Sequence, residues 1–233
     1  MNKVSRLALG GLFLLAAMAG ARAQSSCSSD GQPRPVALLE RFINADCEAC
    51  WSEAATPRPR QGEVALDWIV PGSRGDDAPL SAAASRDGIA RLEQLRRPVP
   101  VAADALRSNA GPAGRRLRVA HGLPFNGYIG TSIELKPAGG PWKAWLVLVE
   151  TVPPGTDGTP LERNLVRNSI QPAWDLTRPL SPLERRRLFE SRPMSIPQGA
   201  NPERLRVVGW VEDARGHIKA IAQSRCAPAP SGG

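Results

Sequence analysis

Two cysteines separated by two residues directly follow an apolar run, and this pattern constrains the fold more than any other part of the chain. The run covers residues 36–43, and the cysteines are Cys47 and Cys50. At the end of a strand and the start of a helix, this spacing is the local geometry of a redox pair, because the two thiols can close into a small disulfide. In an exported chain the same pair could stay permanently oxidised, so two interpretations remain open.

Residues 1–23 have the pattern of a secretory signal peptide. The basic start contains Lys3 and Arg6, residues 7–19 are apolar, and residues 21–23 (Ala-Arg-Ala) match the small-x-small pattern that signal peptidase cleaves. The apolar stretch is too short to span a bilayer as a stable helix. We therefore expect export to the periplasm or the medium, with no membrane span after signal removal. The alternative is an N-terminal anchor that is never cut.

The charge of the chain gives no indication of a nucleic-acid partner. The formal net charge is +8, and it falls to +5 when the three basic residues of the signal peptide are removed. The basic residues are dispersed, and the densest runs, 115–118 and 185–187, are short enough to be parts of solvated faces. Aromatic residues make up 5% of the chain, so no base-stacking platform is visible. We expect no nucleic-acid partner.

The first half, residues 34–110, alternates between strand and helix patterns. Continuous apolar character predicts strands at 36–43 and 63–70. A short helix is expected from Cys47, ended by the prolines at 57 and 59, and a longer one over 80–96. With a third strand at 98–103, this order predicts an α/β domain whose cysteine pair lies at the carboxyl edge of a parallel sheet.

The second half, residues 115–226, is dominated by strand patterns separated by Gly/Pro turns, with one capped helix beginning at Ser181. So many strands with so little helix predict a β-sandwich or barrel. The Ser/Gly/Pro-rich ends, 24–33 and 227–233, are expected to be a flexible segment and a disordered tail. The expected strands are 117–120, 131–135, 142–151, 161–170, 205–211 and 217–222.

Four short segments resemble a family of uncharacterised secreted bacterial proteins. They are the turn at 44–50, the strand at 65–68, the turn at 155–158 and the strand at 164–167. The resemblance implies an α/β thioredoxin-like N-terminal domain followed by a mostly-β, sandwich-like C-terminal domain.

In such a domain a cis proline faces the thiols. No Thr-Pro precedes the expected third strand of this chain, so the resemblance places the cis proline at Pro98 or Pro100. The chain departs from the family's pattern in two further ways. The helix after the cysteines is cut short at Pro57, and the second strand keeps only Asp67-Trp68 of the expected element.

The cysteine roles follow from spacing and count. Cys47 is expected to attack as a thiolate and Cys50 to resolve the mixed disulfide. Asp46 and Glu48 flank the attacking thiol and disfavour a nearby anion. An inert, permanently oxidised pair remains the alternative.

Two cysteines and two histidines remain, far from the pair and from one another. Cys27 and Cys226 are left to bond each other and close a long structural loop, unless they stay free or pair between molecules. We expect no metal and no cofactor. The chain has no second closely spaced pair, and because His121 and His217 are isolated, a tetrahedral site would need the distant cysteines.

Together these features predict a periplasmic thioredoxin-like protein that exchanges disulfides with periplasmic protein thiols through Cys47 and Cys50. The alternative is a non-enzymatic envelope or binding module in which both disulfides are structural and the β-rich part carries recognition. A hydrolase is disfavoured because the chain has no Gly-x-Ser-x-Gly motif.

Overall fold

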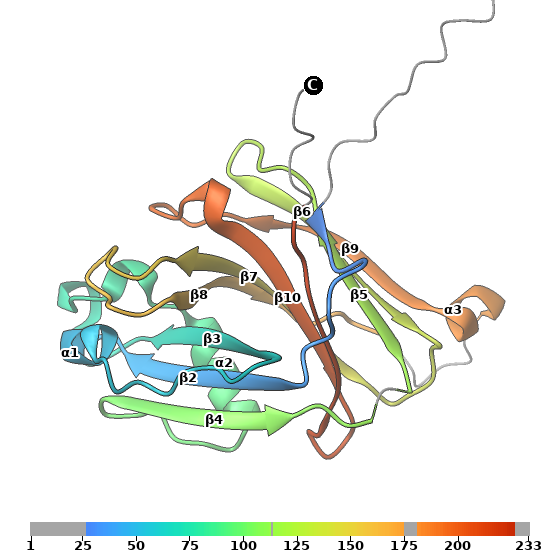
Figure 1. The fold of residues 1–233 in the computed structure, drawn as a ribbon, viewed down its shortest axis with the longest axis horizontal. Helices are drawn as coiled ribbons and strands as arrows, with labels where there is room; N and C mark the ends of the chain where they lie inside the picture. The colour runs from blue at the N-terminus through green and yellow to red at the C-terminus, as the bar shows by residue number, and fades with distance from the viewer. Residues whose placement is uncertain (1–26, 113, 175–180, 227–233) are drawn as a thin grey trace, which may run out of the picture.

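The computed structural model describes residues 27–112, 114–174 and 181–226, and these form two β-sheets with a few short helices (Figure 1). The predicted signal peptide at 1–23 and the tail at 227–233 lie outside the described residues, as do residues 24–26 of the predicted flexible segment 24–33. The rest of that segment is described and begins with the short strand β1 (Cys27–Ser28). No helix in the described part is long and apolar enough to cross a membrane.

The sheets have four and seven strands. The smaller has the order β1-β5-β6-β9 and the larger the order β11-β10-β7-β8-β3-β2-β4. The strands are β1 (Cys27–Ser28), β2 (Ala37–Asn44), β3 (Glu63–Val70), β4 (Ala103–Asn109), β5 (Arg116–His121), β6 (Tyr128–Lys136), β7 (Lys143–Val152), β8 (Arg163–Ile170), β9 (Leu188–Ser195), β10 (Leu205–Glu212) and β11 (Ile218–Gln223).

The expectation of an α/β thioredoxin-like domain followed by a separate β-rich domain is wrong. The described part is mostly strand, and its α-helices are short: α1 (Glu48–Ser52), α2 (Arg86–Gln94) and α3 (Pro182–Arg186). Single 3₁₀ turns occur at η1 (Gly75–Asp77), η2 (Ser81–Ala83) and η3 (Pro202–Arg204). Strands from both halves share the larger sheet, where β3 runs parallel to β8 with Asp67 opposite Leu165.

The first two predicted strands form a parallel pair in the larger sheet. β2 and β3 pair in parallel along their whole length, from Ala37 opposite Glu63 to Asn44 opposite Val70. Every residue of β2 is buried, as its continuous apolar pattern predicts. α1 lies in the crossover between them, so the cysteine pair follows the carboxyl end of β2.

The third expected strand and the second expected helix are displaced from their predicted positions. The strand occupies 103–109, instead of 98–103, and runs antiparallel to β2 at the edge of the sheet. α2 begins at Arg86 because the Ser85 side chain accepts a hydrogen bond from the Asp87 amide and caps the helix there. Gly88 lets this helix approach β3 closely, since a Cβ at that position would lie 2.8 Å from Val70.

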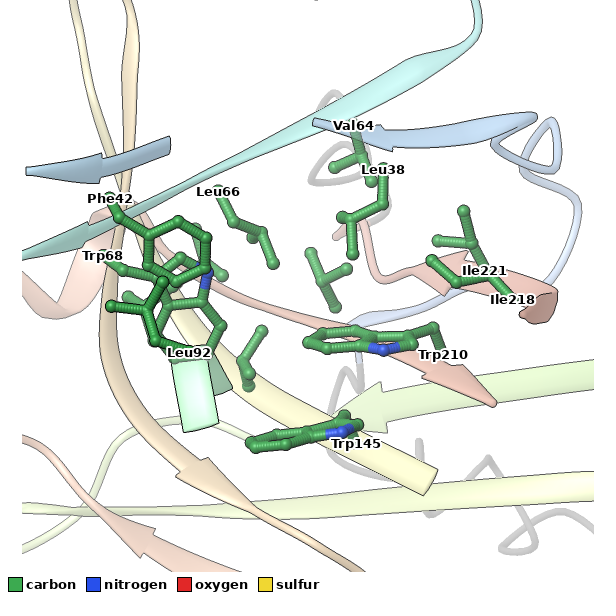
Figure 2. Close-up of a cluster of buried hydrophobic side chains, with 14 of the residues drawn as sticks. Leu38, Phe42, Val64, Leu66, Trp68, Leu92, Trp145, Trp210, Ile218 and Ile221 are labelled. Carbon is green, nitrogen blue, oxygen red and sulfur yellow. The ribbon is translucent and has the colours of Figure 1, made fainter. Parts of the chain in front are cut away.

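Aromatic rings fill the core on one face of the larger sheet (Figure 2). Phe42 stacks on Trp68 with ring centroids 6.2 Å apart, and Trp145 stacks on Trp210 at 5.6 Å. Trp68 and Trp145 meet edge to face at 6.4 Å, which joins the two pairs. Rings from β2, β3, β7 and β10 therefore make one continuous core from segments far apart in the chain.

A second core lies between the two sheets, where β10 faces β5. Val119, Ile133, Leu146 and Val207 are among its fully buried members. Gly209 of β10 is needed at this contact, because a Cβ there would lie 2.7 Å from the Val119 side chain. The smaller sheet thus covers the far side of β10 and β7.

A buried arginine of α2 links two strands that lie near opposite edges of the larger sheet, β2 and β10. Arg91 donates to both carboxylate oxygens of Glu40 at 2.8 Å and pairs with Glu212 at 2.7 Å. Its guanidinium also lies 5.3 Å from the Trp145 ring and 5.1 Å from the Trp210 ring. Burial alone would lower the pKa of Arg91, but the two carboxylates outweigh it and hold the pKa above its ordinary value.

We expect Arg91→Met to lower the free energy of unfolding by about 3–5 kcal/mol, because it leaves two buried carboxylates without their cation. Arg97→Met is the matched control. Arg97 pairs with Asp104, but both side chains are about a third exposed (35% and 32%). Its loss should cost at most about 1 kcal/mol. Urea unfolding of the two variants checks this, and equal losses would contradict it.

Candidate functional site

Cys47 and Cys50 form a disulfide at the junction between β2 and α1, which confirms the predicted pairing. Cys47 occupies the N-cap position of α1, and Cys50 is the central residue of this five-residue helix. Both side chains are partly exposed, whereas β2 before them is fully buried. The disulfide therefore lies at the surface, directly after a fully buried strand.

The two acids beside Cys47 differ in their surroundings. The Asp46 carboxylate accepts hydrogen bonds from the Ser73 amide and hydroxyl at 2.8 Å and from the Arg74 amide at 3.2 Å. Burial alone would raise the pKa of Asp46, but these hydrogen bonds outweigh it and lower the pKa. Glu48 is exposed. The charge of Asp46 is thus stabilised by the segment before η1, and Glu48 is the acid left to act on Cys47.

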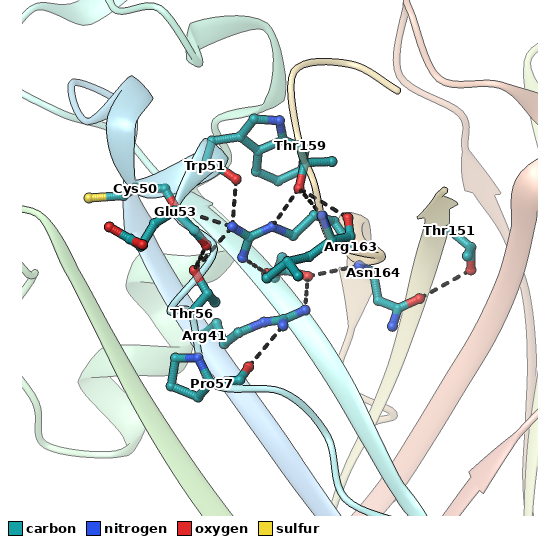
Figure 3. A network of polar contacts seen from close by, with 12 residues as sticks. Arg41, Cys50, Trp51, Glu53, Thr56, Pro57, Thr151, Thr159, Arg163 and Asn164 are labelled. Atoms are coloured by element: carbon teal, nitrogen blue, oxygen red, sulfur yellow. Dashed lines mark hydrogen bonds and ion pairs between the residues drawn. The ribbon is translucent and has the colours of Figure 1, made fainter. Parts of the chain in front are cut away.

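Arg163, the first residue of β8, is hydrogen-bonded to the backbone of α1 (Figure 3). Its Nη2 donates to the carbonyl oxygens of Cys50 and Trp51 and to the Thr56 hydroxyl, at 3.1, 2.5 and 3.2 Å. The guanidinium also lies 5.2 Å from the Trp51 ring. These contacts satisfy carbonyls at the end of a helix that is only five residues long.

Trp51 gives α1 a second attachment. Its indole Nε1 donates to the Asp157 carbonyl oxygen at 2.7 Å. Asp157 lies in the turn between β7 and β8, in the second half of the chain. The helix that carries Cys50 is therefore held by two residues more than one hundred positions away in sequence.

A buried carboxylate holds Arg163 in place. Asp67 pairs with Arg163 at 3.3 Å and with Arg41 at 2.5 Å, and it accepts from the Asn164 amide at 2.8 Å. Burial lowers the pKa of Arg163, and the Arg41 charge adds to that shift, while Asp67 opposes it. Two guanidiniums share one carboxylate, so these three side chains carry one excess positive charge beneath Cys50.

A groove of about 490 Å³ opens beside Cys50, between α1 and the edge strand β4. Its walls include Arg41, Cys50, Thr56 and Asp104, and we call it the Cys50 groove. The Arg41 Nη1 donates to the Pro57 carbonyl at 3.1 Å, and its buried Nε has no hydrogen-bond partner among the described residues. The disulfide therefore borders a cavity large enough for a side chain or a short peptide segment.

The prolines proposed to face the thiols adopt a different arrangement. The cis peptide bonds of the described residues precede Pro137 and Pro141, and those before Pro98 and Pro100 are not cis. Pro98 is exposed. The Pro100 carbonyl accepts a hydrogen bond from the Asn44 side chain at 3.0 Å, so this proline borders the end of β2.

The other two cysteines also form a disulfide, Cys27–Cys226, as the cysteine count predicts. The fold adds a partner that the sequence did not indicate: a ring nitrogen of His121 and both sulfurs lie within 4.8 Å of one another. Burial lowers the pKa of His121, although a hydrogen bond to the Gly122 carbonyl opposes that shift. His217 lies elsewhere, exposed on the turn before β11, beside Asp213.

Sequence reasoning missed Asp67, Arg163 and His121 as parts of these sites. A signal was present for Asp67, since a charged residue inside a continuous apolar strand is rarely buried without a partner. Arg163 and His121 gave no such local signal, because their roles depend on which strands become neighbours.

No protein-family model matches the chain, and no curated protein matches it. A crystal structure of a protein from Agrobacterium tumefaciens is similar at 10% identity, covering 86% of this chain and 98% of that one, with a TM-score of 0.42. A likeness at this level carries no argument about function.

We expect Arg163→Met to loosen α1, because it frees the Cys50 and Trp51 carbonyls and leaves Asp67 with one guanidinium. Amide hydrogen exchange in peptides covering residues 47–56 should become faster, and stability should fall by about 3–5 kcal/mol. Arg58→Met, at an exposed arginine of the same loop, is the control. Unchanged exchange over 47–56 in Arg163→Met would show that Arg163 does not hold the helix.

Proposed function

We propose that this chain is an exported protein that exchanges disulfides with protein thiols through Cys47 and Cys50. The observation that carries the proposal is a partly exposed Cys-x-x-Cys disulfide of which one member, Cys50, lines the Cys50 groove. Two disulfides within one chain support an oxidising compartment, the periplasm or the medium. The resemblance to secreted bacterial proteins supports it through the local motif alone.

The exchange proceeds in two balanced steps. The Cys47 thiolate attacks one sulfur of a substrate disulfide, forming a mixed disulfide and releasing the other substrate sulfur as a thiolate. Cys50, deprotonated, then attacks the Cys47 sulfur, which closes the protein disulfide and releases the second substrate thiol. The substrate gains two electrons and the protein pair loses two. The reverse sequence oxidises a substrate dithiol.

The charges around the pair set how readily it is reduced. Two guanidiniums, Arg41 and Arg163, and one carboxylate, Asp67, together carry one net positive charge. This charge stabilises a nearby cysteine thiolate, which favours the reduced form of the Cys47–Cys50 pair. Glu48 opposes this by like-charge repulsion. β2 and the contacts that Arg163 and Trp51 make with their surroundings hold the two sulfurs close together. Closing the Cys47–Cys50 disulfide therefore requires little ordering of the chain.

A second function is favoured by the same attachments. Arg163 and the Trp51 indole attach α1 to the rest of the fold by hydrogen bonds. In this second function the Cys47–Cys50 disulfide is structural and stays oxidised, adding one more constraint on this helix. The chain would then be an envelope or binding module, with the Cys50 groove or the smaller sheet as its recognition surface. The reduction potential of the Cys47–Cys50 pair distinguishes the two functions.

We expect the Cys47–Cys50 pair to equilibrate with a glutathione or dithiothreitol redox buffer while the protein stays folded. Cys47→Ser should abolish disulfide reductase activity on a peptide disulfide and cost no more than about 2 kcal/mol of stability, because the closed loop is tiny. Cys27→Ser is the control, and should keep the exchange activity while losing roughly 5 kcal/mol.

Mass spectrometry after alkylation measures the fraction of the Cys47–Cys50 pair that is reduced. Circular dichroism on the same samples measures the fraction of protein that is folded. A Cys47–Cys50 pair that stays oxidised until the protein unfolds is structural, and the binding module becomes the better account.

Glu48→Gln should speed alkylation of reduced Cys47 about two- to fourfold at low salt, because removing an exposed like charge raises the thiolate fraction. The effect should shrink as the salt concentration rises. Glu93→Gln, at an exposed position on α2, should leave the rate unchanged. Rates are followed by mass spectrometry with iodoacetamide. A salt-independent effect, or an equal effect in both variants, would argue against this electrostatic role.

A further inference from the structure

The second disulfide lies where three distant segments meet. β1 pairs with β5 so that Cys27 is opposite His121. An isolated bridge between Ser28 and Arg225 then brings Cys226 beside β1. Two sulfurs and one imidazole therefore converge, with a ring nitrogen and both Sγ atoms within 4.8 Å of one another. Thiolate and imidazole are the ligands that soft cations prefer.

The state of the imidazole points to a ligand. His121 is 5% exposed, and its Nδ1 donates to the Gly122 carbonyl oxygen at 2.9 Å. A neutral ring carries one N–H, so Nε2 holds a lone pair. This nitrogen is buried and has no hydrogen-bond partner in the described part of the chain. A histidine that donates one N–H to a backbone carbonyl and keeps the other nitrogen free is arranged as a metal ligand.

We propose that, once the Cys27–Cys226 disulfide is reduced, Cys27, Cys226 and His121 bind one thiophilic d¹⁰ cation, Zn²⁺ or Cu⁺. Two cysteines and one histidine are a known zinc set that leaves a fourth position open to water. The two sulfurs must move apart to about 3.8 Å, the distance between two ligands on Zn–S bonds of about 2.3 Å at the tetrahedral angle. Cys226 is exposed and can swing outward, while Cys27 and His121 stay fixed in the sheet.

The chemistry balances with a dithiol as reductant. The dithiol gives two electrons and two protons to the S–S bond, yielding two cysteine thiols and a disulfide in the reductant. The cation then displaces two thiol protons and binds the two sulfurs and the imidazole nitrogen. A disulfide oxidant that accepts two electrons from the thiolates re-forms the Cys27–Cys226 bond and releases the cation. The site is independent of the Cys47–Cys50 pair and of the exchange function proposed above.

The test uses a Cys47→Ser/Cys50→Ser background, so that Cys27 and Cys226 are the only cysteines. The protein is reduced with dithiothreitol, freed of it anaerobically, and titrated with Co²⁺ as an optical probe for Zn²⁺. Cu⁺ is titrated separately against a chromophoric chelator. We expect one cation per chain, a sulfur-to-cobalt charge-transfer band, and no binding before reduction. The cation whose binding is stoichiometric and depends on His121 is the one that the site takes.

The two histidines provide the matched variants. His121→Gln should weaken binding about tenfold or more and alter the Co²⁺ spectrum, whereas His217→Gln should change neither. Near-ultraviolet circular dichroism follows the fold throughout. If the reduced chain loses structure, His121-dependent recovery on adding Zn²⁺ supports the site. Binding that is equal in His121→Gln and His217→Gln, or absent from the reduced protein, overturns the proposal.

Discussion

The carboxylate of Asp67 holds together segments from both halves of the molecule. It lies in the buried centre of β3 and is shared by Arg41 of β2 and Arg163 of β8. Three buried charges cost much desolvation energy, and they are tolerated because each is hydrogen-bonded as well as paired. The parallel contact between β3 and β8 depends on this arrangement, and through Arg163 so does the position of α1.

The elements that could be predicted from sequence are those with a local signal. β2, β3, β7 and β10 were visible as apolar runs, and the α3 capping box at Ser181 is present as predicted. The architecture could not be predicted, because β8 pairs with β3 across about one hundred residues, and no pattern in either strand specifies its neighbour. The alternation of strand and helix patterns at 34–110 suggested a self-contained α/β domain. Instead, β3 pairs with β8 from the second half, and Asp67 and Trp68 of β3 contact Arg163 and Trp145 from that half.

The sites divide in the same way. Spacing and cysteine count were sufficient for both disulfides, since a two-residue separation favours local closure and leaves Cys27 for Cys226. His121 was considered isolated, because its contact with them depends on the register of a two-residue strand, β1, that has no periodicity to detect. Arg163 was likewise hidden within an ordinary strand pattern.

The two disulfides show how surroundings, more than spacing, determine what a cysteine pair can do. Each lies beside one buried basic side chain supplied by a distant strand, Arg163 for one and His121 for the other. A permanently charged guanidinium can stabilise a thiolate but cannot accept a proton or bind a cation. A neutral imidazole with a free lone pair can do both. Because the neighbouring side chains differ, we propose different chemistry for the two pairs: electron exchange at Cys47–Cys50, and cation binding at Cys27 and Cys226 once their disulfide is reduced.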